Sequence, residues 1–233
     1  MTLFAVLSVT RWISTPQYKE HLNPAWMIPP LGNLVAAIVA PSIDTAGAEV
    51  GWLWFSFAYL MYIALFAVTL HRVIFNEKLV DRLRPTLWIF VAAPAVATSA
   101  YVALNAGWDN FARFNFYTTV IMFSVMTVLT FDRFFGIHKF EMGYWGLVFP
   151  LDTVALVTIQ YQMFVKNLLT QVISYFAISI ATFVVSMCIL HTVMALLRRK
   201  IFIPDEKWGP TSFMKLTHEA FKNSNSSISQ HLF

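Results

Sequence analysis

The chain has 233 residues, of which 58% are hydrophobic and 12% are charged, and its formal net charge is +4. Soluble domains carry about 25% charged residues, so this composition leaves too little polar surface to cover a globule in water and excludes that class of protein. The modest net charge also gives no reason to expect a nucleic-acid partner.

Six apolar segments are long enough to cross a bilayer as helices, because a hydrocarbon core of about 30 Å needs roughly 20 residues. In chain order they cover residues 25–43, 51–70, 85–108, 114–131, 142–165 and 167–190. The stretch 1–10 is also apolar, but it has about half the required length. We interpret it as the end of a preceding helix or as a segment at the membrane interface.

This pattern predicts an all-α membrane protein organised in three parts. Residues 1–24 would hold an N-terminal stub and a cytoplasmic loop, residues 25–197 a transmembrane domain of six spans, and residues 198–233 a cytoplasmic tail. Fourteen of the 16 lysines and arginines then lie on the side of both termini, and only Arg113 and Lys166 lie on the other. Because lysine and arginine are retained in the cytoplasm during insertion, we expect a cytoplasmic C-terminus.

Prolines occur in alternate spans. Pro29 and Pro30 lie in the first span, Pro94 in the third and Pro150 in the fifth, whereas the second, fourth and sixth spans have none. A proline inside a helix removes one backbone hydrogen bond and bends the axis, and in lipid the freed carbonyl needs a partner or a water-filled cavity. The pattern favours three hairpins, each with a proline-kinked inner helix near a cavity and a straight outer helix. The alternative is that prolines are simply commoner in membrane helices than in soluble ones.

Several stretches, in the correct order, resemble the slow-type anion channel / tellurite-resistance–C4-dicarboxylate transporter family, also called the voltage-dependent anion channel family. The stretches within the spans are PPLGNLVAA (29–37), RPTLWIFVAAPAVATSAY (84–101) and YWGLVFP (144–150). The loop LHRVIFNEKLVDRLRP (70–85) and the tail FMKLTHEAF (213–221) are similar to the plant-type branch.

The resemblance implies ten transmembrane helices, arranged as five hairpins around a central pore in each subunit of a homotrimer. It also implies that a phenylalanine on the ninth helix closes the pore, and Phe149 is the residue at the matching position. The chain would supply the C-terminal portion, the last three hairpins. Three inner helices cannot enclose such a pore, so we expect that the chain is a fragment, that its start is misassigned or that it assembles differently. We expect it in the plasma membrane.

The fifth span carries the residues with the most specific expected roles. Helical spacing places six of them along one stripe: Trp145, Phe149, Asp152, Leu156, Ile159 and Met163. Such a stripe is more often packing than pore. The prolines and the resemblance favour the pore for Phe149, whose ring would block a narrow apolar path by its size and by dewetting.

Asp152 is unusual because a carboxylate at bilayer depth costs about 2.5–3.5 kcal/mol on insertion scales. We expect it to face the bundle interior, where it is paired or protonated. An ionised Asp152 next to Phe149 would repel anions, so flux would depend on its protonation. The alternative is a hydrogen-bonded acid that bridges helices. Plant-type members of the family carry a neutral residue at this position. The carboxylate of Asp152 therefore argues against simple anion conduction.

These observations favour part of a passive anion channel that passes chloride, nitrate or malate, with Phe149 as gate and Pro30, Pro94, Pro150 and Asp152 as pore-lining or helix-kink candidates. Small anions and membrane lipids are the expected partners. One alternative is a proton-coupled transporter of a C4-dicarboxylate or sulfite, and another is a truncated chain without transport of its own. No nucleophile–base pair, phosphate loop or metal-ligand spacing occurs in the sequence, so we expect neither an enzyme nor a cofactor or metal.

Overall fold

The structure is a computed structural model that describes residues 2–17, 22–76, 79, 81–134 and 142–197. Residues 1–188 form one compact unit, and a second unit, 189–233, begins within the last described helix. The predicted cytoplasmic tail, 198–233, lies outside the described residues.

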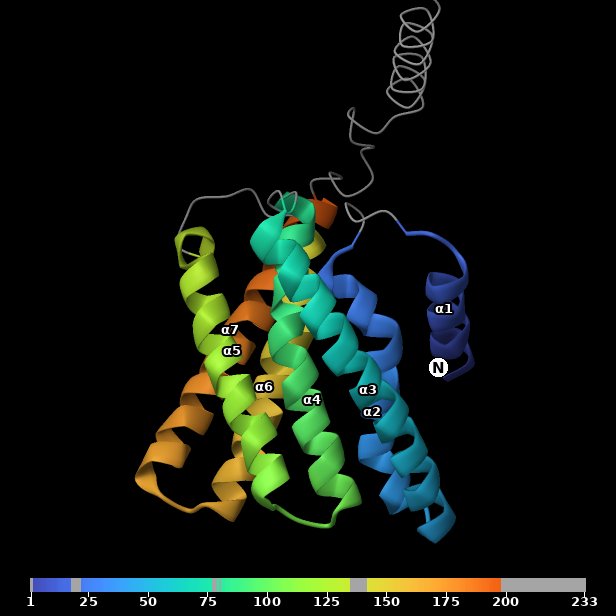
Figure 1. The fold of residues 1–233 in the computed structure, drawn as a ribbon. Coiled ribbons are helices and arrows are strands. Elements are labelled where there is room, and N and C mark those ends of the chain that lie inside the picture. The colour runs from blue at the N-terminus through green and yellow to red at the C-terminus, as the bar shows by residue number, and fades with distance from the viewer. Residues whose placement is uncertain (1, 18–21, 77–78, 80, 135–141, 198–233) are drawn as a thin grey trace, which may run out of the picture. The chain divides into compact units, whose positions relative to one another are not determined.

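All regular structure in the described part of the chain is helical (Figure 1). Its α-helices are α1 (Thr2–Ser14), α2 (Ile28–Val39), α3 (Thr45–Phe75), α4 (Ile89–Leu104), α5 (Asn110–Phe134), α6 (Trp145–Phe164) and α7 (Leu168–Leu197). Short 3-10 helices precede or follow some of them: η2 (Pro24–Met27), η3 (Ala40–Ser42), η4 (Asp81–Trp88) and η5 (Met142–Tyr144). Six helical segments have the length and the apolar composition to cross a membrane, so the predicted all-α architecture with six spans is confirmed. The helix α1 is shorter than these six.

Polar side chains at the helix ends explain where the structure departs from the predicted boundaries. The helix α3 begins several residues before the predicted start at residue 51, because the carboxylate of Asp44 accepts a hydrogen bond of 2.6 Å from the backbone N–H of Gly47. The helix α4 ends at Leu104 with Ala106 in a left-handed conformation (φ 51°). The N–H of Gly107 then returns to the carbonyl of Val102 at 3.1 Å, as in a Schellman C-cap.

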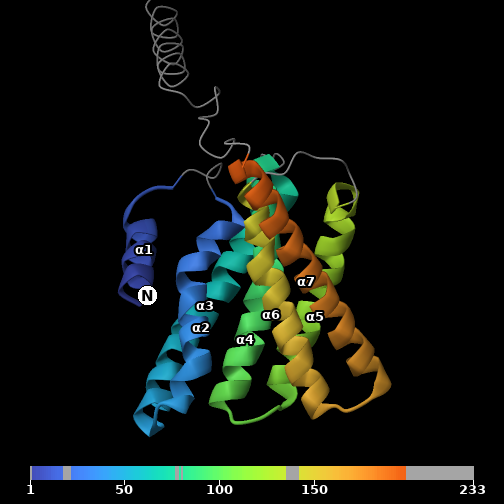
Figure 2. The same cartoon turned by 180° about the vertical axis from the view of Figure 1, so that it is seen from behind.

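The helix α4 is the centre of the first unit. It contacts α2, α3, α5 and α6, and every residue from Leu87 to Ala100 is buried. Figures 1 and 2 show α4 between α2 and α6. Its buried stretch is rich in alanine, and such small residues let helix backbones approach closely where lipid supplies no hydrophobic driving force.

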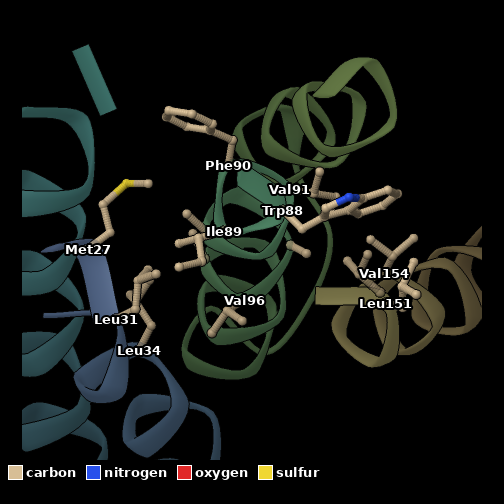
Figure 3. Close-up of a cluster of buried hydrophobic side chains, with 14 of the residues drawn as sticks. Met27, Leu31, Leu34, Trp88, Ile89, Phe90, Val91, Val96, Leu151 and Val154 are labelled. Carbon is tan, nitrogen blue, oxygen red and sulfur yellow. The ribbon is translucent and has the colours of Figure 1, made fainter. Parts of the chain in front are cut away.

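Larger side chains at the start of α4 fill the space toward two of its neighbours, α2 and α6. In Figure 3, Ile89 and Val96 point toward Leu31 and Leu34 of α2, whereas Val91 lies on the other side of α4, next to Trp88. Trp88, the last residue of η4, also points toward α6, where Leu151 and Val154 lie. All of these side chains belong to one buried apolar cluster. The third span therefore packs on both sides within the chain.

The short helix α1 is attached to the span that follows it. The hydroxyl of Thr2 donates a hydrogen bond of 2.8 Å to Oδ1 of the buried Asn33 in α2. The indole rings of Trp12 and Trp26 stack with their centroids 4.9 Å apart. These two contacts lie at opposite ends of α1, so the segment packs along the first span.

The close approach of α3 to its neighbours should make Gly51 intolerant of a side chain. A Cβ there would lie 2.8 Å from Cβ of Ala40 and 2.7 Å from Cδ2 of Leu104. We expect Gly51→Val to lower the free energy of unfolding by about 1–3 kcal/mol through overpacking, even after the gain in helix propensity of under about 1 kcal/mol. Thermal unfolding of the protein in detergent measures this loss.

Gly107 provides the matched control. A Cβ at that position meets nothing within 4 Å. Gly107→Val should therefore change stability by about 0.5 kcal/mol or less. Equal melting temperatures for the Gly51 and Gly107 variants would contradict the close packing of α3 on α4.

Candidate functional site

One face of α6 is exposed in this chain although its opposite face is buried against the bundle. The exposed side chains recur with the helical period and form what we call the α6 stripe: Trp145, Phe149, Asp152, Leu156 and Met163. The buried side chains of the other face include Leu147, Leu151, Val154 and Val157. Four of the residues in the α6 stripe are apolar and one is a carboxylate, a combination that neither a soluble surface nor a lipid-facing surface normally presents.

Phe149 lies on the α6 stripe with 46% of its surface exposed. Its ring is not wedged between neighbouring helices, and among the described residues it stacks on no other aromatic ring. The next residue, Pro150, is buried. The ring of Phe149 thus lies on the exposed face of α6.

Asp152 lies three residues after Phe149 and is also exposed on the α6 stripe. One helical turn spans about 5.4 Å, so this carboxylate lies about one turn along the helix from Phe149. No hydrogen bond or ion pair joins Asp152 to another of the described residues. The structure therefore brings Phe149 and Asp152 together on one face.

Pro94 and Pro150 lie inside α4 and α6, and both are buried. Proline has no backbone N–H, so the carbonyl four residues earlier in each helix loses its usual hydrogen bond. A hydroxyl lies close to each site: Thr98 donates to the carbonyl of Pro94 at 2.7 Å, and Thr153 donates to that of Pro150 at 2.8 Å. Such side-chain bonds to the helix backbone often accompany a bend.

Pro30 lies at a position where a proline does not kink a helix. It is buried in the first turn of α2, next to Pro29, where a backbone N–H has no partner within the helix. Proline is tolerated in that turn, so Pro30 does not interrupt the hydrogen bonds of α2. Pro94 also lies apart from the α6 stripe, because the stretch of α4 around it is buried on all sides. The structure groups Phe149 with Asp152, and it does not bring Pro30 or Pro94 to that face.

A polar contact that the sequence did not reveal joins α4 to α6. The hydroxyl of Ser99 donates a hydrogen bond of 2.8 Å to Oε1 of Gln160. Ser99 is almost completely buried, whereas Gln160 is partly exposed at the edge of the α6 stripe. The only sequence signal was the position of Gln160, one turn after Leu156 and two turns after Asp152.

The link between α4 and α5 carries an ordered acidic residue. The hydroxyl of Tyr101 donates to Oδ2 of Asp109 at 2.6 Å, and the N–H of Ala112 donates to Oδ1 at 2.9 Å. These bonds, with that from Tyr101 the stronger influence, hold the pKa of Asp109 below its usual value. The carboxylate therefore stays ionised at neutral pH and caps the start of α5.

The described residues include no group of three or more His, Cys, Asp or Glu side chains that could hold a metal ion. The one cysteine, Cys188, is buried in α7. The candidate site consists of the aromatic ring of Phe149, the carboxylate of Asp152 and the amide of Gln160 along α6.

Known proteins are similar to this chain over most of its length. A family model described as "Voltage-dependent anion channel" matches residues 1–193. The S-type anion channel SLAH3 of Arabidopsis thaliana is 29% identical over 198 residues, which are 84% of this chain and 31% of SLAH3. The S-type anion channel SLAH2 of the same plant is 28% identical over 230 residues, which are 92% of this chain and 43% of SLAH2.

A more distant relative is an uncharacterized transporter of Methanocaldococcus jannaschii, 25% identical over 187 residues that cover 70% of this chain and 54% of that transporter. The chain thus spans between about a third and a half of the length of these relatives.

Proposed function

This chain belongs to the voltage-dependent anion channel family, and from that membership we propose that it lines part of a passive path for small anions across a membrane. The observation that supports the proposal is the α6 stripe, which exposes Phe149 and Asp152 while the opposite face of the helix is buried. A helix that faced only lipid would not carry a carboxylate on its exposed side, because that placement is costly.

In this proposal the ring of Phe149 is the gate. A bulky ring in a narrow apolar path stops ions by its size and by dewetting, and it needs no charge to do so. The buried Pro150 that follows it removes a backbone hydrogen bond and so gives this part of α6 more freedom to move. A change of rotamer or a small shift of the helix would then open the path.

The path needs further walls, because α4 is buried within the bundle and does not expose a second polar face beside α6. We propose that additional helices complete the path, as the greater length of the relatives suggests, and that the assembly is a homotrimer in the plasma membrane with its C-terminus in the cytoplasm. Chloride, nitrate and malate are the proposed ions.

Electrophysiology tests the proposal. The chain is expressed in oocytes, and whole-cell currents are recorded in chloride, nitrate and malate solutions against uninjected cells. A passive anion path predicts a current that reverses at the equilibrium potential of the anion in use. A surface-expressed chain whose currents equal those of uninjected cells would instead be one without transport of its own.

The exposure of Asp152 favours a second candidate, a proton-coupled transporter of a C4-dicarboxylate or sulfite. A carboxylate beside the path could bind a proton that travels with the anion. The two candidates differ in what sets the reversal potential. A passive path gives a reversal potential that depends on the anion gradient alone, whereas coupling to protons makes it shift with the pH gradient.

For the passive path, we expect Asp152→Asn to raise the anion current at neutral pH. A negative charge about 6 Å from a passing anion costs about 0.7 kcal/mol at an effective dielectric constant of about 80 and about 3 kcal/mol at about 20, so its removal should raise the current about threefold or more. The parent current should also rise as the pH is lowered, and that rise should be absent in Asp152→Asn. Recordings between pH 5 and pH 8 check both effects, and an unchanged pH dependence in the variant would exclude this role.

A further inference from the structure

The hydrogen bond between Ser99 and Gln160 sets the orientation of an amide at the edge of the α6 stripe. Other hydroxyls in these helices, such as those of Thr98 and Thr118, bond to a carbonyl four residues earlier in their own helix. Ser99 instead reaches from α4 to Oε1 of Gln160, which is 61 positions away in the sequence. Because this bond occupies the carbonyl end of the amide, the NH₂ end is the one left to interact elsewhere.

The NH₂ group of Gln160 has no hydrogen-bond acceptor among the described residues. The side chain is partly exposed, while its partner Ser99 is 1% exposed, so the amide lies where the buried interior of α4 meets the exposed face of α6. It follows Leu156 by four residues and Asp152 by eight, which places it about 12 Å along the helix from the carboxylate. Gln160 also follows Phe149 by 11 residues, about three helical turns, so the two positions lie on nearly the same side of α6.

We propose that the amide of Gln160 binds a singly charged anion in transit, and that Ser99 positions it. This inference rests on the proposed function, since it places the site on the same path. Amide N–H groups donate to chloride or to a nitrate oxygen, and hydrogen bonds to a charged partner are stronger than neutral ones. Neutral donors also hold the ion weakly enough for it to leave, which conduction requires.

The surroundings of Gln160 favour monovalent anions over a dicarboxylate. The helices α4 and α6 contain one charged residue between them, Asp152, and it is negative. A malate dianion would lose more hydration than chloride or nitrate and would find no cation on these two helices in compensation. The site therefore predicts that chloride and nitrate are more permeant than malate.

The decisive variant is Gln160→Glu. The carboxylate has nearly the same shape and still accepts the hydrogen bond from Ser99, but it replaces the two donors by a negative charge. We expect the chloride and nitrate currents to fall at least about tenfold at matched surface expression, while the melting temperature in detergent stays close to that of the parent chain. If Gln160 only ties α6 to α4, the same variant keeps the parent current.

Two further variants distinguish the effect of the N–H donors of Gln160 from any effect on folding. Gln160→Met removes the donors without adding charge, and it should also lower the current about tenfold. Ser99→Ala leaves the amide in place but free to rotate, and it should change the nitrate-to-chloride permeability ratio about twofold or more. The matched control is Gln162→Glu, since Gln162 is partly exposed two residues further along α6 and has no bond to Ser99. It should leave the current within about twofold of the parent.

The outcomes distinguish this inference from the function on which it rests. If the parent chain conducts and both Gln160 variants carry the same current with the same permeability ratios, the inference is overturned and the proposed function stands. If the surface-expressed parent chain carries no anion current at all, the proposed function fails, and the assignment of Gln160 fails with it.

Discussion

Replacing Phe149 with alanine is expected to raise the basal anion current several-fold at matched surface expression. The ring lies exposed on the α6 stripe, free of stacking partners among the described residues. Its truncation would widen the path and let water enter, which removes both parts of the barrier that an apolar constriction presents. Because the side chain is not part of the buried core, the substitution should leave folding largely intact.

Phe164 offers a control with the same chemistry on the same helix. It is 49% exposed, close to the 46% of Phe149, but it stacks on Trp108 with ring centroids 5.9 Å apart and lies at the end of α6. Phe164→Ala should leave the basal current unchanged. A Phe149→Ala current equal to or below that of the parent chain, with normal surface expression, would remove the gate assignment.

The largest effect on stability is expected from Ala93→Phe. Ala93 is completely buried in α4, the helix that contacts α2, α3, α5 and α6. A phenyl ring at that position would force apart helices that alanine allows to approach closely. We expect a loss of about 3 kcal/mol or more in the free energy of unfolding, seen as a large drop in melting temperature and in the monodisperse fraction after detergent extraction.

Ala67→Phe is the control for this substitution, because Ala67 is exposed on α3 and apolar surface is tolerated there. It should have a melting temperature close to that of the parent chain. If Ala93→Phe were equally well tolerated, α4 would not be the packed centre of the bundle.

The sequence predicted the spans well because the length and hydropathy of a segment decide whether it can cross a membrane. Helical periodicity also placed Phe149 and Asp152 on one stripe, and the structure exposes both on one face of α6. That face stays a proposed pore wall, since periodicity finds the stripe but does not identify what covers it.

The remaining features depended on contacts that hydropathy does not encode. Pro30 falls in the first turn of α2 because the preceding chain forms the 3-10 turn η2, in which Asn23 accepts a hydrogen bond of 3.0 Å from the N–H of Ala25. The burial of α4 on all sides had one signal, its run of small residues, but α7 is equally apolar and stays largely exposed among its described residues. The bond between Ser99 and Gln160 joins residues 61 positions apart, and no local pattern predicts such a pair.

Cysteine accessibility tests most directly whether the α6 stripe faces water. In a chain whose buried Cys188 is replaced by alanine, single cysteines are placed at 149, 152 and 156 on the stripe. As a lipid-facing comparison, others are placed at Val128 and Phe183, which are 79% and 69% exposed on α5 and α7. Thiols must ionise in water to react with a charged, water-soluble reagent.

A water-lined path along α6 predicts rapid modification at all three stripe positions and little at the two comparison positions. Stripe cysteines that react as slowly as those at Val128 and Phe183 would show that this face of α6 meets lipid or protein, and the proposed path would be contradicted.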